Sequence, residues 1–96
     1  MWFVYILRCR DNSLYTGITT DLDKRLARHN TGQGAKYTAS RIPVKIVYYE
    51  EHPDKSSAIA REHSLKGLTK AKKEELVASS LVNKIDFLYY SKEKIS

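Results

Sequence analysis

The sequence predicts an α/β (α+β) domain, in which a small, mainly antiparallel three-stranded sheet is flanked by helices in the order β-β-α-β-α-α. Two β-rich runs, Trp2 to Arg10 and Leu14 to Thr19, are separated by the turn-forming residues 11–13, which is typical of a β-hairpin. Capped helical segments follow, with one more β-rich run among them. Strands and helices in this order bury their apolar faces by packing the helices on the sheet.

The first strand is expected at the centre of the sheet. Positions 3, 5 and 7 on one face and positions 2, 4 and 6 on the other are all apolar or aromatic. A strand that is apolar on both faces is usually covered on both sides. If the hairpin turn has an odd number of residues, Tyr5 and Tyr15 point to the same face.

The first helix is predicted to begin with a capping box, with the Thr20 hydroxyl at the cap and Asp23 three residues later. It should run to about Asn30 and stop at the glycine-containing segment 31–34. A basic loop, Lys36 to Arg41, is expected next.

The second half of the domain continues with a strand and two helices. Pro43 leads into a strand from Val44 to Glu51. Residues 53–56 open a helix that Gly67 should end, and Thr69 caps a helix from Lys70 to about Ala78. We assign residues 1–80 to one domain and residues 81–96 to an extension that forms a short helix with a frayed end.

The composition is that of an ordinary folded protein, and its positive charge favours a phosphate-bearing partner. The chain has 96 residues, 42% hydrophobic and 29% charged, with a formal net charge of +6. Excess Lys and Arg favours nucleic acid, because neutralising phosphates releases counterions. No apolar run is long enough to span a bilayer, the start lacks the features of a secretory signal, and Cys9 is the single cysteine. We therefore expect a cytoplasmic protein with a buried, structural Cys9 and no membrane partner.

Two helices carry polar residues beside their apolar stripes. In the first, Arg25 and His29 border the stripe that begins at Leu22, so they either reach a partner in a cleft or are a snorkelling arginine and a solvated histidine. In the second, Glu62 is either half of an ordinary i, i+4 ion pair with Lys66 or a ligand for a divalent cation. The spacing of the histidines and Cys9 disfavours zinc, and no nucleophilic triad is recognisable.

These residues together resemble the GIY-YIG nuclease superfamily. Phe3-Val4-Tyr5 and Tyr15-Thr16-Gly17 are similar to its two naming triplets, with Phe3 in place of the first glycine. Arg25 and Glu62 fall on the helices that carry the superfamily's arginine and glutamate. The likeness spans residues 2–73 and is greatest to short stand-alone bacterial members; other relatives are the excinuclease subunit that incises damaged DNA and the intron-homing endonucleases.

The resemblance implies a metal-dependent endonuclease that hydrolyses DNA, with structure-selective activity of the repair or recombination type. Glu62 would hold one Mg²⁺ or Mn²⁺, and Arg25 would stabilise the transition-state charge. Tyr5 would orient or deprotonate water, which requires help for a phenol with a pKa near 10. Tyr15 would hydrogen-bond in the same cleft, and His29 would transfer a proton. The expected nucleic-acid contacts are Gly17, Lys36, Tyr37, Arg41 and Lys66.

The sequence also departs from the superfamily, and other functions stay open. Ile18 occupies a position where some relatives have a lysine, which leaves His29 and Lys36 as the nearest helpers for the base. The alternatives are a nucleic-acid-binding module with little or no catalysis, on DNA or RNA, and a protein-interaction domain. We expect a monomer, with a weak dimer as the alternative.

Overall fold

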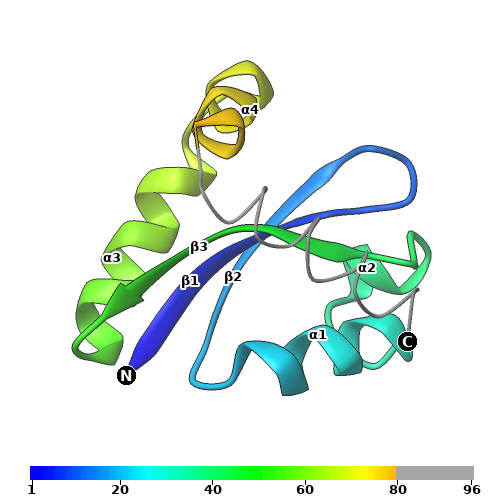
Figure 1. The fold of residues 1–96 in the computed structure, drawn as a ribbon, viewed down its shortest axis with the longest axis horizontal. Coiled ribbons are helices and arrows are strands. Elements are labelled where there is room, and N and C mark those ends of the chain that lie inside the picture. The colour runs from blue at the N-terminus through cyan, green and yellow to red at the C-terminus, as the bar shows by residue number, and fades with distance from the viewer. Residues whose placement is uncertain (80–96) are drawn as a thin grey trace, which may run out of the picture.

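The three strands form one antiparallel sheet, as predicted. The computed structural model describes residues 1–79, so the predicted extension and its short helix lie outside the described residues. The strands are β1 (Trp2–Arg8), β2 (Leu14–Thr19) and β3 (Lys45–His52). Their order in the sheet is β2-β1-β3, which confirms the central position of β1 (Figure 1). The fold class and the order of the predicted elements are therefore confirmed.

The bounds of two strands differ from the prediction by one or two residues. β1 ends at Arg8 because Cys9 and Asn12 already belong to the turn: the Cys9 amide donates to the Ser13 carbonyl, and Asn12 has a φ of 71°. β3 begins and ends one residue later than expected. In the hairpin, Tyr5 pairs with Gly17 and Leu7 pairs with Tyr15. Tyr5 and Tyr15 consequently lie on the same face, as predicted.

The first helices show one correction to the cap and one additional element. In α1 (Leu22–Asn30) the capping side chain is that of Asp21, which accepts a hydrogen bond from the Lys24 amide, and not that of Thr20. The predicted basic loop contains a short helix, α2 (Lys36–Ala39). A helix of four residues has no periodicity that a sequence pattern can detect.

The last two helices match their predicted signals. α3 (Lys55–Lys66) begins at the Asp54 cap and ends at Gly67, and α4 (Lys70–Ala78) begins at the Thr69 cap. Both caps accept a hydrogen bond from an amide three residues later. Within the residues described, no helix has the length and apolar character needed to cross a membrane.

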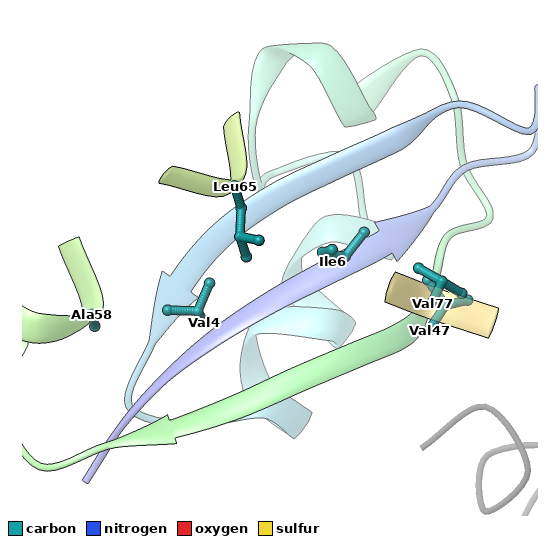
Figure 2. Close-up of a cluster of buried hydrophobic side chains, with 6 residues drawn as sticks. All are labelled: Val4, Ile6, Val47, Ala58, Leu65 and Val77. Carbon is teal, nitrogen blue, oxygen red and sulfur yellow. The ribbon is translucent and has the colours of Figure 1, made fainter. Parts of the chain in front are cut away.

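The sheet separates two apolar clusters. The first lies between the sheet and α3 and α4, and its buried members are Val4, Ile6, Val47, Ala58, Leu65 and Val77 (Figure 2). The second lies on the other face, towards α1 and α2, and its buried members are Tyr5, Leu7, Cys9 and Val44. β1 supplies buried side chains to both, which is why its sequence is apolar on both faces. Cys9 is 4% exposed, and burial raises its thiol pKa, consistent with a structural role.

Candidate active site

Tyr5 lies across the neighbouring edge strand. A Cβ atom added to Gly17 would stand 2.7 Å from Tyr5 Cζ, closer than real Cβ contacts allow. The ring of Tyr5 therefore occupies the space that a side chain at position 17 would need. Gly17 was expected to contact nucleic acid; its immediate effect is to admit the Tyr5 ring. The phenol oxygen is thereby carried over β2.

A chain of hydrogen bonds extends from this phenol. Tyr5 Oη is 2.9 Å from His29 Nε2, and His29 Nδ1 is 2.8 Å from Thr38 Oγ1. The Thr38 hydroxyl donates its proton to the Ala35 carbonyl at 3.0 Å, so it accepts from His29 Nδ1. In neutral His29 the proton then lies on Nδ1, and Nε2 accepts from the Tyr5 hydroxyl. The chain is thus directed from tyrosine to histidine.

Buried contacts fix the imidazole of His29. His29 is 1% exposed and Thr38 is 0% exposed, so the alternative of a solvated histidine is wrong. The Tyr15 ring packs edge-on against His29 with a centroid distance of 5.4 Å. A side chain at Gly34 would collide with the imidazole ring. Thr38 and Gly34 were not among the predicted site residues, although Gly34 lies in the glycine-containing segment 31–34 and Thr38 in the predicted basic loop.

The environment keeps both groups of the chain neutral. Burial raises the pKa of Tyr5 well above its ordinary value of about 10, and the nearby Arg25 charge opposes this without overcoming it. Burial, with a smaller effect of Arg25, lowers the pKa of His29. A cation alone therefore does not make Tyr5 a base. The neutral imidazole in contact with it can accept its proton.

Two charged residues approach the phenol from opposite faces of the sheet. Arg25 is exposed on α1, and Glu62 is half-buried on α3. Both change the pKa of Tyr5, Arg25 lowering it and Glu62 raising it, so both are within electrostatic range. Glu62 Oε2 also pairs with Lys66 Nζ at 3.3 Å, the ion pair that the sequence offered as an alternative. The candidate site therefore lies beside β2, within electrostatic range of one charged residue from each helical layer.

Aromatic rings continue from His29 to the surface. Tyr15 stacks on Tyr37 with a centroid distance of 6.1 Å and an interplanar angle of 21°. The Arg41 guanidinium lies 3.9 Å from the centroid of the Tyr37 ring, and its Nε forms an ion pair with Asp11 Oδ2 at 3.0 Å. Tyr37 is 41% exposed. Two of the predicted nucleic-acid contacts, Tyr37 and Arg41, are thus joined to the predicted catalytic residues, while Lys36 is exposed on the first residue of α2.

The site offers a metal ion one carboxylate, that of Glu62. Among the described residues, no three His, Cys, Asp or Glu side chains are grouped so that they could hold an ion. Glu62 is a single hard oxygen donor at a cationic edge of the sheet. Magnesium is commonly bound by one or two carboxylates, with water and substrate phosphate completing its shell. The donor set fits a cation that arrives with a phosphate, and it does not fit a zinc site or a permanently held structural ion.

Comparison with known proteins gives a family match over most of the chain. A family model described as the GIY-YIG catalytic domain matches residues 1–75. A UPF0213 protein of Natronomonas pharaonis is 53% identical over 76 residues, which are 79% of this chain and 89% of the relative. A UPF0213 protein of Clostridium perfringens is 47% identical over 87 residues, which are 91% of this chain and 94% of the relative. The relatives are therefore about as short as this chain.

Two solution structures are similar in fold as well as in sequence. A UPF0213 protein from Bacillus halodurans is 43% identical, has a TM-score of 0.56, and is matched over 88% of this chain and 94% of that chain. A protein from E. faecalis is 38% identical, has a TM-score of 0.55, and is matched over 80% of this chain and 82% of that chain.

Proposed function

Because the chain belongs to the GIY-YIG family, we propose that it is a divalent-metal-dependent endonuclease that hydrolyses phosphodiester bonds of DNA. The observation that supports this most directly is the directed chain from Tyr5 through His29 to Thr38. It supplies a buried proton acceptor beside a phenol that lies within electrostatic range of an arginine and a glutamate from two different helices.

The proposed reaction uses Tyr5 as a relay. The phenol accepts a proton from the attacking water while its own proton moves to His29 Nε2, so no free phenolate forms. The resulting hydroxide attacks phosphorus, and the bond to the leaving oxygen breaks. His29 Nδ1 keeps its proton throughout and donates it in a hydrogen bond to the Thr38 hydroxyl. This bond holds the ring in the tautomer whose Nε2 accepts from Tyr5. The raised pKa of Tyr5 is compatible with this route, because both transfers occur in one step.

The charged residues act on the phosphate. Arg25 presents a permanently charged planar fork to the oxygens that gain charge in the transition state. Glu62 is the proposed ligand of Mg²⁺ or Mn²⁺, and the bound ion would polarise the phosphate and stabilise the leaving oxygen. Lys66, paired with Glu62 when no ion is bound, would turn to a flanking phosphate. Tyr15 would support the imidazole and the substrate from the β2 side.

The substrate is proposed to be an irregular DNA structure of the kind that repair or recombination produces. Lys36, Tyr37 and Arg41 would contact the backbone and bases that flank the cut. The described fold has a single small sheet with its helices, and such a surface reads shape and phosphates more readily than a long sequence. The cytoplasmic location, the monomeric state and binding to RNA stay predictions.

The experiment that tests this function is cleavage of a labelled panel in Mg²⁺ and in Mn²⁺. The panel holds duplex, single-stranded, nicked, flap and four-way-junction DNA and one structured RNA. Wild-type protein should cut at least one DNA, and Glu62→Ala, Arg25→Ala and Tyr5→Phe should each lower the rate by about 10²-fold or more. Matched controls are Glu75→Ala, an exposed carboxylate on α4, and Arg28→Ala, an exposed arginine on α1. Both controls should keep wild-type rates.

The alternatives have distinct results in the same experiment. Folded protein that cuts nothing, but binds DNA with an affinity that falls log-linearly with salt, is a binding module. A slope of about −0.9 per contacted phosphate would be expected for duplex DNA. Weak binding with no dependence on salt would support a protein-interaction domain. Either result contradicts the endonuclease.

A further inference from the structure

The face of α3 that meets the sheet is unusually polar at its middle. Of the residues in this helix, Ala58 and Leu65 are fully buried, and both reach the cluster drawn in Figure 2. The turn between them presents Arg61 and Glu62, which are half-buried. Alanine is too small to resist rotation of the helix, so Leu65 is the one large apolar anchor. Apolar packing alone therefore leaves the rotation of α3 about its own axis weakly determined.

Arg61 anchors α3 a second time, through the carboxylate of Glu50, which is also contacted by two other side chains. Its Nε donates to both oxygens of Glu50 at 3.0 Å, and its Nη2 lies 2.9 Å from Glu50 Oε2. Glu50 also accepts from the Tyr48 hydroxyl and lies 3.0 Å from His52 Nε2. Burial raises the pKa of Glu50, but the hydrogen bonds from Arg61, Tyr48 and His52 together lower it by more. The net effect is a lowered pKa, so the carboxylate is charged at neutral pH. A planar guanidinium held at two oxygens fixes direction as well as distance.

Arg61 and Glu62 are consecutive residues of one helix turn. Successive residues of an α-helix point about 100° apart. Arg61 is turned to β3, on the far side of β1, while Glu62 acts on the Tyr5 phenol above β2. Any rotation that moves one of these side chains moves the other by the same angle.

The geometry points to a positioning role, which rests on the metal-binding function proposed for Glu62. We infer that the Arg61–Glu50 pair is a rotational lock of α3 that sets where Glu62 presents its carboxylate to the metal and phosphate. A side-chain tip lies about 6 Å from a helix axis, so a rotation of about 10° displaces it by about 1 Å. Displacements of this size cost large factors in catalytic rate. The pair itself, partly exposed to solvent, contributes little to stability.

The chain offers a matched control in a second bidentate pair. Arg8 on β1 donates from Nη2 to Glu74 Oε1 on α4 at 2.7 Å and from Nη1 to Oε2 at 2.9 Å. The side chains of Arg8 and Glu74 are 23% and 32% exposed. The corresponding exposures of Arg61 and Glu50 are 37% and 20%. Both pairs join a strand to a helix on the same face of the sheet, but α4 carries no proposed catalytic residue. Breaking the control pair should cost similar stability without moving Glu62.

The test compares Glu50→Gln and Arg61→Lys with Glu74→Gln and Arg8→Lys in the full chain. The first two variants should raise the Mg²⁺ concentration for half-maximal cleavage by about tenfold and weaken Mn²⁺-induced broadening of amide signals around Glu62 by a similar factor. DNA affinity in EDTA should change less than twofold. The control variants should match wild type in all three measurements. Equal shifts in both pairs of variants, or none in either, would overturn the lock.

A metal-free measurement separates the lock from the proposed function. Residual dipolar couplings of the α3 amides, referred to those of β1, report rotation of the helix about its axis. Glu50→Gln and Arg61→Lys should change these couplings, and the control variants should not. If wild-type protein neither cuts DNA nor binds Mn²⁺ at Glu62, the endonuclease proposal fails. Unchanged α3 couplings in Glu50→Gln and Arg61→Lys overturn the lock whether or not the protein is a nuclease.

Discussion

Replacing Gly17 by alanine should destabilise the protein through one identifiable collision. The added Cβ would stand 2.5 Å from Tyr5 Oη and 2.7 Å from Tyr5 Cζ. Tyr5 is 2% exposed, so its ring cannot swing into solvent to make room. Overpacking of this kind costs about 1–3 kcal/mol in the free energy of unfolding. Reduced freedom of the unfolded chain offsets about 0.4–1 kcal/mol of that cost.

The mid-range values leave a net loss of about 1.3 kcal/mol, which corresponds to a Tm lower by roughly 5–10 °C for a domain of this size. Thermal unfolding followed by circular dichroism measures it. Gly67→Ala is the matched control, because Gly67 has a φ of −77° and a Cβ there would meet only ordinary contacts at 3.5 Å and beyond. Alanine at position 67 should leave Tm unchanged or slightly higher. A Tm for Gly17→Ala equal to that of Gly67→Ala would refute the packing of Tyr5 over Gly17.

Two further predictions concern the hydrogen-bond chain. Thr38→Val removes the acceptor of His29 Nδ1 and should cost about 1–3 kcal/mol in the free energy of unfolding, while Thr38→Ser, which keeps the hydroxyl, costs less. In ¹⁵N spectra, wild-type His29 should show a protonated Nδ1. The Thr38→Val variant should shift the tautomer equilibrium of His29 away from this form. Burial, aided by Arg25, lowers the folded-state pKa of His29 below the value of about 6.5 for an unfolded chain. As the pH falls below about 6.5 the unfolded chain takes up this proton first, so urea midpoints should decrease from pH 7 to pH 5. His29→Gln should remove this part of the slope, and an unchanged slope would contradict the buried neutral imidazole.

Local signals explain why most elements could be predicted from the sequence. The apolar faces of β1, the Asp54 and Thr69 caps and the stop at Gly67 each depend on residues that are close in the chain. The misassigned cap at the start of α1 is instructive, since Thr20 and Asp21 both have capping side chains. The backbone decides between them: Asp21 has the extended φ of −144° that a cap requires, and its amide donates to Thr19 Oγ1.

The candidate site was predicted less completely, because its geometry depends on residues that meet only in the fold. Tyr5 and His29 are 24 positions apart, and their contact makes histidine the proton acceptor of a phenol. Without that contact, the sequence shows only a phenol whose pKa is unsuitable for a base, and a nearby cation is the partner one would look for. Thr38 had no recognisable role until the fold brought it to the other imidazole nitrogen. A family pattern names the residues, whereas hydrogen-bond partners assign their protonation.

The proposed site combines two halves that the sheet keeps apart, and they should fail in different ways. The proton chain lies wholly on the α1 and α2 face and is fixed by short buried contacts around His29. The metal ligand comes from the α3 face, where its position depends on Leu65 and the Arg61–Glu50 pair. Damage to the first half should therefore change the pH dependence of cleavage, and damage to the second should change the metal concentration it requires. Kinetics of Thr38→Val and Glu50→Gln, measured against both pH and Mg²⁺, would separate the halves, and identical responses of the two variants would show that the division is wrong.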